Sequence, residues 1–330
     1  MRWIYRRAIT AVATIFAATN IIFFIIRLMP GNIIDSLIGY YIDKMQMTYA
    51  DAYRMLSASF GIALNRPLHE QYLSFLYNTF TGNLGKSLSF GNLPIAGIIA
   101  RAIPWTVFSV SIGLLTSFVA GILLGLLSAY KHGSVLDKFL TTLSTVITAV
   151  PNYILAYFFI IIFTAWLGLL PSVGAYDAGR VTPGFNLSFI LSVLRHSALP
   201  IMSYFVASFG SWTLYMRGNT VSVLGEDYVM AAKARGLKST RIAWMYVGRN
   251  AMLPLFTILA INLGYIFGGS TLIESVFAYP GIGYFISQSV GVRDYSLMQG
   301  LFFILTVAVT VSNFMADLLY SRLDPRVKFE

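Results

Sequence analysis

The residues of this 330-residue chain whose types and spacing could do chemistry concentrate in one basic segment, residues 217–249. Its cationic side chains are Arg217, Lys233, Arg235, Lys238, Arg241 and Arg249. The segment is helix-forming and polar, and long uncharged stretches flank it on both sides. Such a loop can bind a protein partner or lipid phosphates, so we expect its chemistry to be recognition.

Enzyme chemistry is not indicated elsewhere in the chain. The sequence has no GxxxxGK[ST] loop that would cradle phosphates, it contains no cysteine, and no paired carboxylates or histidines converge in a polar segment. We therefore expect no ATP hydrolysis, no metal site and no cofactor bound by this chain itself.

The composition is that of a membrane protein. Hydrophobic residues make up 57% of the sequence and charged residues 11%, with a mean hydropathy of +0.72. A helix needs about 20 apolar residues to cross the hydrocarbon core, and backbone polar groups in lipid must be satisfied internally. Charge-free windows of roughly that length lie at residues 8–26, 102–130, 139–176, 197–216, 251–273 and 295–316. The sequence thus predicts an all-α, polytopic membrane protein with six transmembrane helices.

Basic residues predict how these helices are oriented. Lysine and arginine concentrate in cytosolic loops, and the most basic short segments are the N-terminus and residues 217–249. Four spans between them place both on the cytosolic side. Two short spans within residues 139–176 would instead separate them. We expect one span there, kinked at Pro151, and both termini in the cytosol.

Two other interpretations of the basic residues are less favoured. The net charge of +10 could indicate nucleic-acid binding, but no stripe of basic and aromatic residues lies outside the apolar windows. Arg6 and Arg7 could begin a cleaved signal peptide, but the apolar run that follows is about 20 residues, longer than the usual 7–15. We expect an uncleaved first span and a multi-pass protein of the cell membrane, in contact with lipid.

One substantial insertion, residues 31–101, is expected outside the cell. Thr48 followed by Asp51 resembles a capping box and predicts a helix that begins there and runs to Gly61. A second helix should begin after Pro67. Both segments contain charges and are too short to span, so we expect them to lie on the membrane surface.

Three parts are therefore predicted along the chain: the N-terminus with the first transmembrane helix (1–30), the extracytosolic insertion (31–101), and a core transmembrane domain (102–330) that includes the cytosolic loop 217–249. Two further outside loops are expected at residues 168–196 and 271–295.

Within the cytosolic loop, a short helix is predicted from Asp227. Acidic residues favour its N-terminus, and Gly236 suits the left-handed conformation that ends a helix. Ser239 can cap a second short helix. Residues three or four apart share a helix face, which groups Tyr228, Ala231, Ala232 and Arg235. Small alanines beside an aromatic ring form a surface that a partner can approach closely; the alternative is an interfacial helix whose basic residues face lipid phosphates.

The loop and several other stretches resemble the permease subunits of ABC importers, in the dipeptide/oligopeptide/nickel branch. In the loop the resemblance rests on Ala231-Ala232, Gly236, Leu237 and Leu253-Pro254. The other stretches are, in chain order, RLMPGN at 27–32, NRPLHEQY at 65–72, GNLG at 82–85, HSALP at 196–200, ESVFAYPGIG at 274–283 and LDPR at 323–326. Each is weak alone, but together they cover nearly the whole chain in order. Met230 departs from the pattern, which often has Glu there.

The resemblance implies the type I permease fold of ABC importers. Such a chain would form half of a translocation pathway beside a second homologous permease subunit. Its loop would dock on one or two cytosolic ABC ATPase subunits, which use ATP and Mg, and an extracytosolic solute-binding protein would deliver substrate. The coupling residues would then be Asp227, Tyr228, Ala231, Ala232, Arg235, Gly236 and Leu237.

Polar side chains within the predicted spans are candidates for lining the pathway, because isolated amides and hydroxyls are costly in lipid. They are Asn20, Ser208, Ser211, Asn262 and Asn313. Hydrogen bonding between helices is the alternative for each of them, and it is the more common role of such side chains in membrane helices. Asp317 is expected to pair with a basic residue or reach the headgroups.

Substrate and class stay open. We expect di- and oligopeptides, with oligosaccharides or nickel chelates as alternatives, because selectivity in this family resides largely in the separate binding protein. An ion-coupled secondary transporter would need charged residues at the bilayer midplane and often internal repeats, and neither is visible. A structural or signalling membrane protein would leave the docking loop unexplained.

Overall fold

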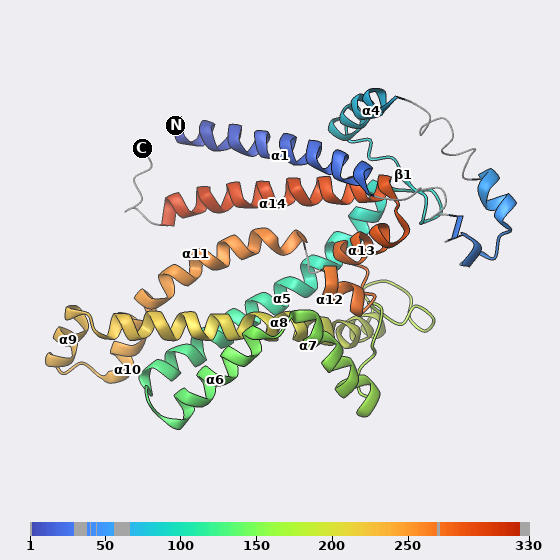
Figure 1. Ribbon diagram of the computed structural model, residues 1–330. Coiled ribbons are helices and arrows are strands. Elements are labelled where there is room, and N and C mark those ends of the chain that lie inside the picture. Colours follow the sequence, from blue (N-terminus) through green and yellow to red (C-terminus); the bar gives the residue numbers. More distant parts are fainter. Residues whose placement is uncertain are drawn as a thin grey trace. The chain divides into compact units, whose positions relative to one another are not determined.

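The computed structural model describes residues 2–29, 38–39, 41–43, 45–55, 67–268 and 271–323, and most of them are helical (Figure 1). The chain divides into two compact units. Unit 1 is Met1–Thr106, Phe267–Thr271 and Pro280–Glu330, and unit 2 is Val107–Ile266 and Leu272–Tyr279. Each unit is described by itself, and helix α5 (Ile95–Tyr130) contributes to both.

Five helical segments among the described residues are long and apolar enough to cross a membrane. They are Ile4–Leu28, Ile95–Tyr130, Leu187–Leu224, Ser239–Gly268 and Tyr295–Met315. The predicted windows at 8–26, 102–130, 197–216 and 295–316 overlap these helices, and the window at 251–273 does so up to Gly268. The chain is therefore a multi-pass membrane protein.

The predicted span at 139–176 is broken. Helix α6 (Val135–Ala149) ends before Pro151, and α7 (Asn152–Phe159) with the π-helical η1 (Ile160–Trp166) continues after a bend of 101°. A residue before proline is pushed into extended conformation, and Val150 has ψ 127°. Proline is tolerated where a helix begins, so Pro151 separates two helices where a kink in one was expected. By length and composition, the described residues contain five candidate crossings, or six if the bent pair is one span.

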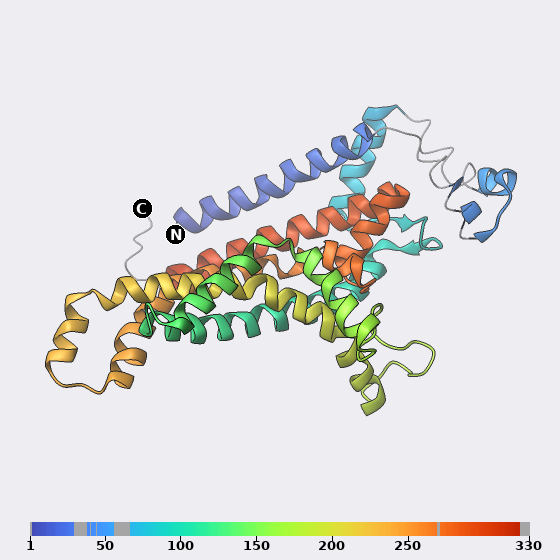
Figure 2. The ribbon, with the colours of Figure 1, turned by 60° about the horizontal axis from the view of Figure 1, so that its bottom comes forward.

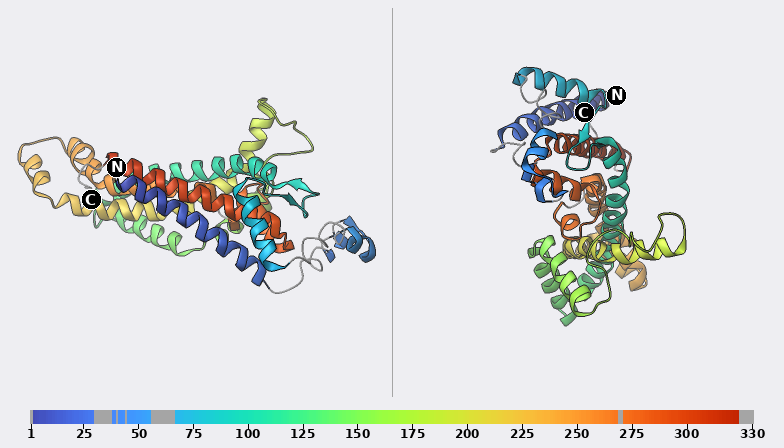
Figure 3. Two further views of the ribbon diagram at one scale, coloured as in Figure 1. Left: turned by 90° about the horizontal axis from the view of Figure 1, so that it is seen from above. Right: turned by 90° about the vertical axis from the view of Figure 1, so that its right-hand side faces the viewer.

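In unit 1, helices α1 (Arg2–Leu28) and α14 (Tyr295–Leu323) lie side by side (Figures 1 and 3). The predicted pairing of Asp317 is confirmed, because its Oδ2 lies 3.0 Å from Nη1 of Arg7. The beginning of α1 and the end of α14 thus meet at one end of this unit. Helix α13 (Ile282–Val292) packs on α14 through Ile286, Leu297 and Leu301.

Helix α4 (Leu68–Phe80) packs along α1 through aromatic rings. The ring centroids of Phe75 and Phe23 are 5.3 Å apart, and those of Tyr72 and Phe24 are 5.8 Å apart. The predicted helix after Pro67 is confirmed.

The capping box before it is also confirmed. Thr48 Oγ1 donates to Asp51 Oδ2 at 2.6 Å, the Asp51 N–H donates to Thr48 Oγ1 at 3.3 Å, and residues 49–55 are helical. The predicted end of that helix at Gly61 lies outside the described residues.

A small antiparallel hairpin was missed by the all-α prediction. Strand β1 (Lys86–Ser87) pairs with β2 (Leu93–Pro94). Gly91 and Asn92 both have positive φ, +63° and +59°, which is the conformation of a tight hairpin turn. The Gly-Asn pair is the only local signal for it in this stretch.

The hairpin is held by a buried carboxylate, Asp294, which also caps α14. Its Oδ2 accepts hydrogen bonds from Ser87 Oγ at 2.6 Å, Ser89 Oγ at 2.8 Å and the N–H groups of Leu88 and Ser89 at 3.0 and 3.1 Å. Its Oδ1 accepts from the Leu297 N–H at 3.1 Å. Neutral donors alone thus satisfy this carboxylate among the described residues.

In unit 2, α5 packs closely on α8 (Leu187–Leu224) and α11 (Arg249–Tyr265). A Cβ at Gly121 would lie 2.4 Å from Trp212 Cβ, and one at Gly125 would lie 2.5 Å from Thr213 O. Small residues let membrane helices approach to this distance. Phe118, Trp212 and Leu255 are buried where the three helices meet.

The two outside loops of the sequence prediction contact each other in this unit. Gly174 N–H donates to Phe277 O at 2.9 Å, and the hydroxyls of Ser197 and Tyr279 are 3.0 Å apart. Burial raises the pKa of Tyr279 to about 12, so this hydroxyl stays protonated and able to hydrogen-bond.

Candidate functional site

The basic loop of the sequence prediction is built from α9 (Asp227–Ala234), α10 (Ser239–Arg241) and the π-helical η2 (Ile242–Gly248). Figure 2 shows α9 and α10 beyond the end of α8, joined to it through Gly225. Glu226 takes the N-cap position of α9, and Asp227 adds negative charge in its first turn, where the helix dipole favours it.

Helix α9 ends as predicted at Gly236, which has φ +70°. The Gly236 N–H donates to Lys233 O at 2.9 Å, and the Leu237 N–H donates to Ala232 O at 3.3 Å. This pair of bonds is the Schellman motif, which closes a helix and usually brings in a hydrophobic residue after the glycine. Leu237 fills that role by packing on the buried residues of the loop.

The two sides of α9 differ sharply in burial. Val229 and Ala232 are 0% and 3% exposed, and they pack against Ile242 and Val247 of η2. Tyr228 is 40% exposed. The other exposed residues of the predicted coupling set are Asp227, Ala231, Arg235 and Gly236.

Two predictions about this loop are therefore corrected. Ala232 does not share the exposed face of Tyr228, Ala231 and Arg235, because η2 folds back and covers it. Ser239 does not cap the second helix, because Lys238 occupies the N-cap position and makes no side-chain capping bond.

Beneath the loop lies an ion pair that sequence reasoning missed. Arg217 donates from Nε to Asp137 Oδ1 at 2.6 Å and from Nη2 to Asp137 Oδ2 at 2.9 Å. The Asp137 side chain is 4% exposed, and it also accepts from Ser128 Oγ at 2.6 Å and from the Gly133 N–H at 2.9 Å. The bidentate geometry is that of the strongest side-chain pairs.

The ion pair joins three elements at one end of unit 2. Asp137 lies in the first turn of α6, where Ser134 Oγ accepts from its N–H at 3.2 Å, and Ser128 lies near the end of α5. Arg217 lies in the last two turns of α8, which leads into α9. The turn between α5 and α6 and the stem of the basic loop are thus fixed to each other. The Ser134 capping pattern was readable in the sequence; its link to Arg217, eighty residues away, was not.

The predicted pathway residues do not form one cluster within either unit. Asn20 and Asn313 belong to unit 1, and Ser208, Ser211 and Asn262 belong to unit 2. Asn20 accepts a hydrogen bond from the Tyr72 hydroxyl and donates to Phe16 O at 2.6 Å, so it anchors α4 on α1. The other four are half-buried and make no side-chain hydrogen bond with a described residue.

Metal ligands are sparse in the part of the chain that the structure describes. No group of three or more His, Cys, Asp or Glu side chains there is arranged to hold a metal ion. The basic loop instead forms a packed helical projection, made of α9, α10 and η2, at the end of α8. Such a surface suits contact with another protein.

Comparison with known proteins matches this architecture. The family described as binding-protein-dependent transport system inner membrane component matches residues 121–329. A Brucella suis biovar 1 protein assigned as a peptide permease is 33% identical over 328 residues, covering 99% of both chains. The oligopeptide transport system permease protein AppB of Bacillus subtilis is 29% identical over 99% of both chains, and OppB of Haemophilus influenzae is 29% identical over 100% of both. The chain belongs to the family of inner membrane components of binding-protein-dependent transport systems.

Proposed function

We propose that this chain is a membrane-spanning permease subunit of an ATP-driven ABC importer and forms half of the translocation pathway for di- and oligopeptides. The exposed face of α9 is the observation that carries the proposal. It presents Tyr228, Ala231 and Arg235 on a helix that is closed at its C-terminal end by Gly236 and packed on η2 through its buried side, within the region that the family matches.

The mechanism follows from how the loop is held. A partner ATPase that closes on ATP would push against the exposed face of α9. The buried contacts of Val229 and Ala232 with η2 would pass that push to α11. The Asp137–Arg217 ion pair would pass it through α8 to α5 and α6. A rigid loop transmits displacement, whereas a loose one would absorb it.

We further propose six spans with both termini in the cytosol, counting the bent pair α6 and α7 as one span. In unit 1 the ion pair of Arg7 with Asp317 puts the start of α1 and the end of α14 at one level. In unit 2 the α5–α6 turn and the basic loop share one end. Both levels are rich in basic residues, as cytosolic segments are.

The partners follow from this assignment. A second homologous permease subunit would complete the pathway, one or two cytosolic ABC ATPase subunits would use ATP and Mg, and an extracytosolic solute-binding protein would deliver substrate to the outside loops. The chain itself would bind no nucleotide. We also propose that the chain divides into the N-terminal span (1–30), the extracytosolic insertion (31–101) and the core transmembrane domain (102–330).

Peptides are favoured as substrates because the relatives share that class. AppB and OppB are named as oligopeptide permeases, DppB of Pseudomonas aeruginosa as a di/tripeptide permease, and GsiC of Shigella flexneri as a glutathione permease. All are peptides of different length, so the names indicate the class and leave length open. Oligosaccharides and nickel chelates are the alternatives.

Reconstitution tests the proposal directly. The chain is incorporated into vesicles with its second permease, ATPase and binding protein, and uptake of labelled di- to pentapeptides is measured with ATP inside. We expect ATP-dependent uptake of at least one peptide length. Uptake driven by an ion gradient without ATP, or uptake of maltooligosaccharides or nickel chelates in place of every peptide, would contradict the proposal.

A further inference from the structure

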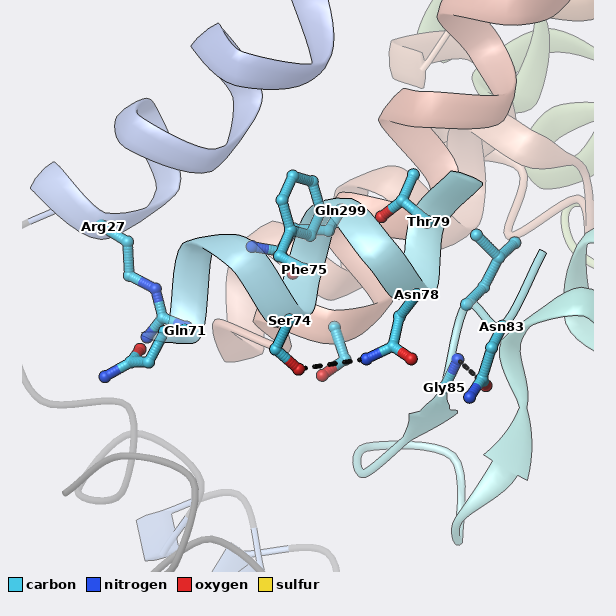
Figure 4. A pocket seen from close by; sticks show the side chains of 12 residues that line it. Arg27, Gln71, Ser74, Phe75, Asn78, Thr79, Asn83, Gly85 and Gln299 are labelled. Carbon is cyan, nitrogen blue, oxygen red and sulfur yellow. Dashed lines mark hydrogen bonds between the residues drawn. The ribbon is translucent and has the colours of Figure 1, made fainter. Parts of the chain in front are cut away.

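A polar cavity of about 250 Å³ lies within unit 1, between α1, α4 and the start of α14 (Figure 4). Its polar lining includes Arg27, Ser74, Asn78, Ser296 and Gln299, and none of its lining residues is acidic. Neither the transport mechanism nor the docking loop uses this cavity. The polar lining of this cavity therefore needs a separate explanation.

Two hydrogen-bond donors in this cavity have no acceptor. Arg27 Nε and Gln299 Nε2 are buried and make no hydrogen bond with any described residue. A buried donor left without an acceptor is costly and rare in folded proteins. Both donors line the same cavity, as does Gln71, whose Oε1 is buried there, so an anion bound in the cavity would meet two open donors and one amide group.

The charge of Arg27 also has no counter-ion among the described residues. No carboxylate among the described residues pairs with it; its guanidinium instead lies over the rings of Phe23 and Tyr295, at 5.5 and 5.8 Å from their centroids. The aromatic contacts hold the guanidinium in a defined position without neutralising it. A planar, fixed guanidinium is suited to bidentate contact with an oxyanion.

The position of the cavity indicates the source of that oxyanion. Arg27 lies in the last turn of α1, at the end of the candidate span Ile4–Leu28, where a headgroup would be found. The volume accommodates one phosphate group and lies below the ~300 Å³ at which pockets for whole small molecules usually begin.

We propose that this cavity binds the phosphate of an anionic phospholipid headgroup, held by Arg27 and Gln299 at the outer end of α1. The absence of acidic side chains from its lining disfavours choline or ethanolamine headgroups, whose cations would need a carboxylate or an aromatic cage. The lipid would hold α4 against α1 and α14, and so would order the part of the extracytosolic insertion that α4 forms.

Lipid titration of the purified full chain tests this inference. Phosphatidylglycerol or phosphatidylcholine is added in detergent, and bound lipids are counted by native mass spectrometry for wild type, Arg27→Gln, Gln299→Leu and the control Arg101→Gln. Arg101 is an exposed arginine of the same unit that does not line the cavity. We expect the apparent affinity for phosphatidylglycerol to fall about tenfold or more in Arg27→Gln, as expected for loss of a charged hydrogen bond, and less in Gln299→Leu. Arg101→Gln should bind like wild type.

Two further arms separate the sources of the anion. Inorganic phosphate and dialanine are each offered at millimolar concentration to the phosphatidylglycerol complex. Retention of the lipid would support the headgroup assignment. Displacement of the lipid by phosphate or dialanine in wild type would overturn the assignment in favour of a soluble anion. Equal phosphatidylglycerol binding by wild type and both cavity variants would overturn the site altogether. Arg27→Lys, which keeps the charge, guards against misfolding of Arg27→Gln and should bind with intermediate affinity.

Discussion

On helix α9, Val229 and Ala232 are buried, while Tyr228 and Ala231, each one residue earlier, are exposed. The buried pair packs on η2 and belongs to the core of the loop. The exposed pair touches nothing comparable and faces outward with Arg235. Neighbouring residues of one short motif therefore have different tasks, since one side keeps the loop folded and the other is available to a partner.

The difference matters for interpreting mutations. A charge introduced at Ala232 would disturb the fold of the loop, so a loss of transport in that variant would say nothing about docking. A charge introduced at Ala231 leaves the packing intact and tests docking alone. The Asp137–Arg217 ion pair likewise belongs to the part that keeps the loop in place, because it lies on α6 and α8 and not on the exposed face of α9.

Removal of the arginine from the buried ion pair should have the largest effect. Arg217→Leu would leave the Asp137 carboxylate buried without its cation, which typically costs about 3–5 kcal/mol. Thermal melting of the full chain in detergent would show it as a large fall in the midpoint. Arg241→Leu is the matched control, because Arg241 is exposed in the same loop. Similar melting of the two variants would show that the ion pair does not stabilise the stem.

The paired variants Ala232→Glu and Ala231→Glu test most directly whether the two sides of α9 differ in burial. Burying a carboxylate among Val229, Ile242 and Val247 should cost about 3 kcal/mol, whereas the exposed substitution should change stability by no more than about 0.5 kcal/mol. Limited proteolysis of the loop would separate them, since only Ala232→Glu should be cut faster than wild type. Equal protection would mean that Ala232 is not packed as described.

A smaller effect is expected from two glycines that differ in backbone conformation. Gly236 has φ +70°, whereas Gly218 lies inside α8, and at either position a Cβ would meet nothing within 4 Å. Gly236→Ala should cost about 1 kcal/mol because of its left-handed conformation, and Gly218→Ala should gain up to about 1 kcal/mol of helix propensity. Melting of both variants checks the sign. Two shifts in the same direction would contradict the role of Gly236 as the cap of α9.

The sequence pattern predicted the elements whose cause is local. Apolar windows located the long helices, Thr48 and Asp51 located a helix start, and Gly236 located a helix end, because each depends on residues within one turn. The outcome at Pro151 shows the limit of such reasoning. Proline predicts an interruption there, but the 101° between α6 and α7 depends on what the two helices pack against.

Features made by distant segments were out of reach. The carboxylate of Asp137 meets Arg217 across eighty residues, and that of Asp294 meets Ser87 and Ser89 across more than two hundred. The burial of Ala232 depends on η2 folding back over α9. Helical periodicity groups Ala232 with Tyr228 and Ala231, and only tertiary packing separates them.

Retention of the ATPase by the permease tests the central claim most directly. The assembled importer is purified through a tag on this chain, and the molar ratio of ATPase to permease is measured for wild type, Ala231→Glu and Lys131→Glu, which adds negative charge to an exposed residue in the α5–α6 turn. We predict that Ala231→Glu retains a normally folded permease but loses most of the ATPase, while Lys131→Glu retains it. Full retention with unchanged peptide-dependent ATP hydrolysis in Ala231→Glu would contradict docking through the exposed face of α9.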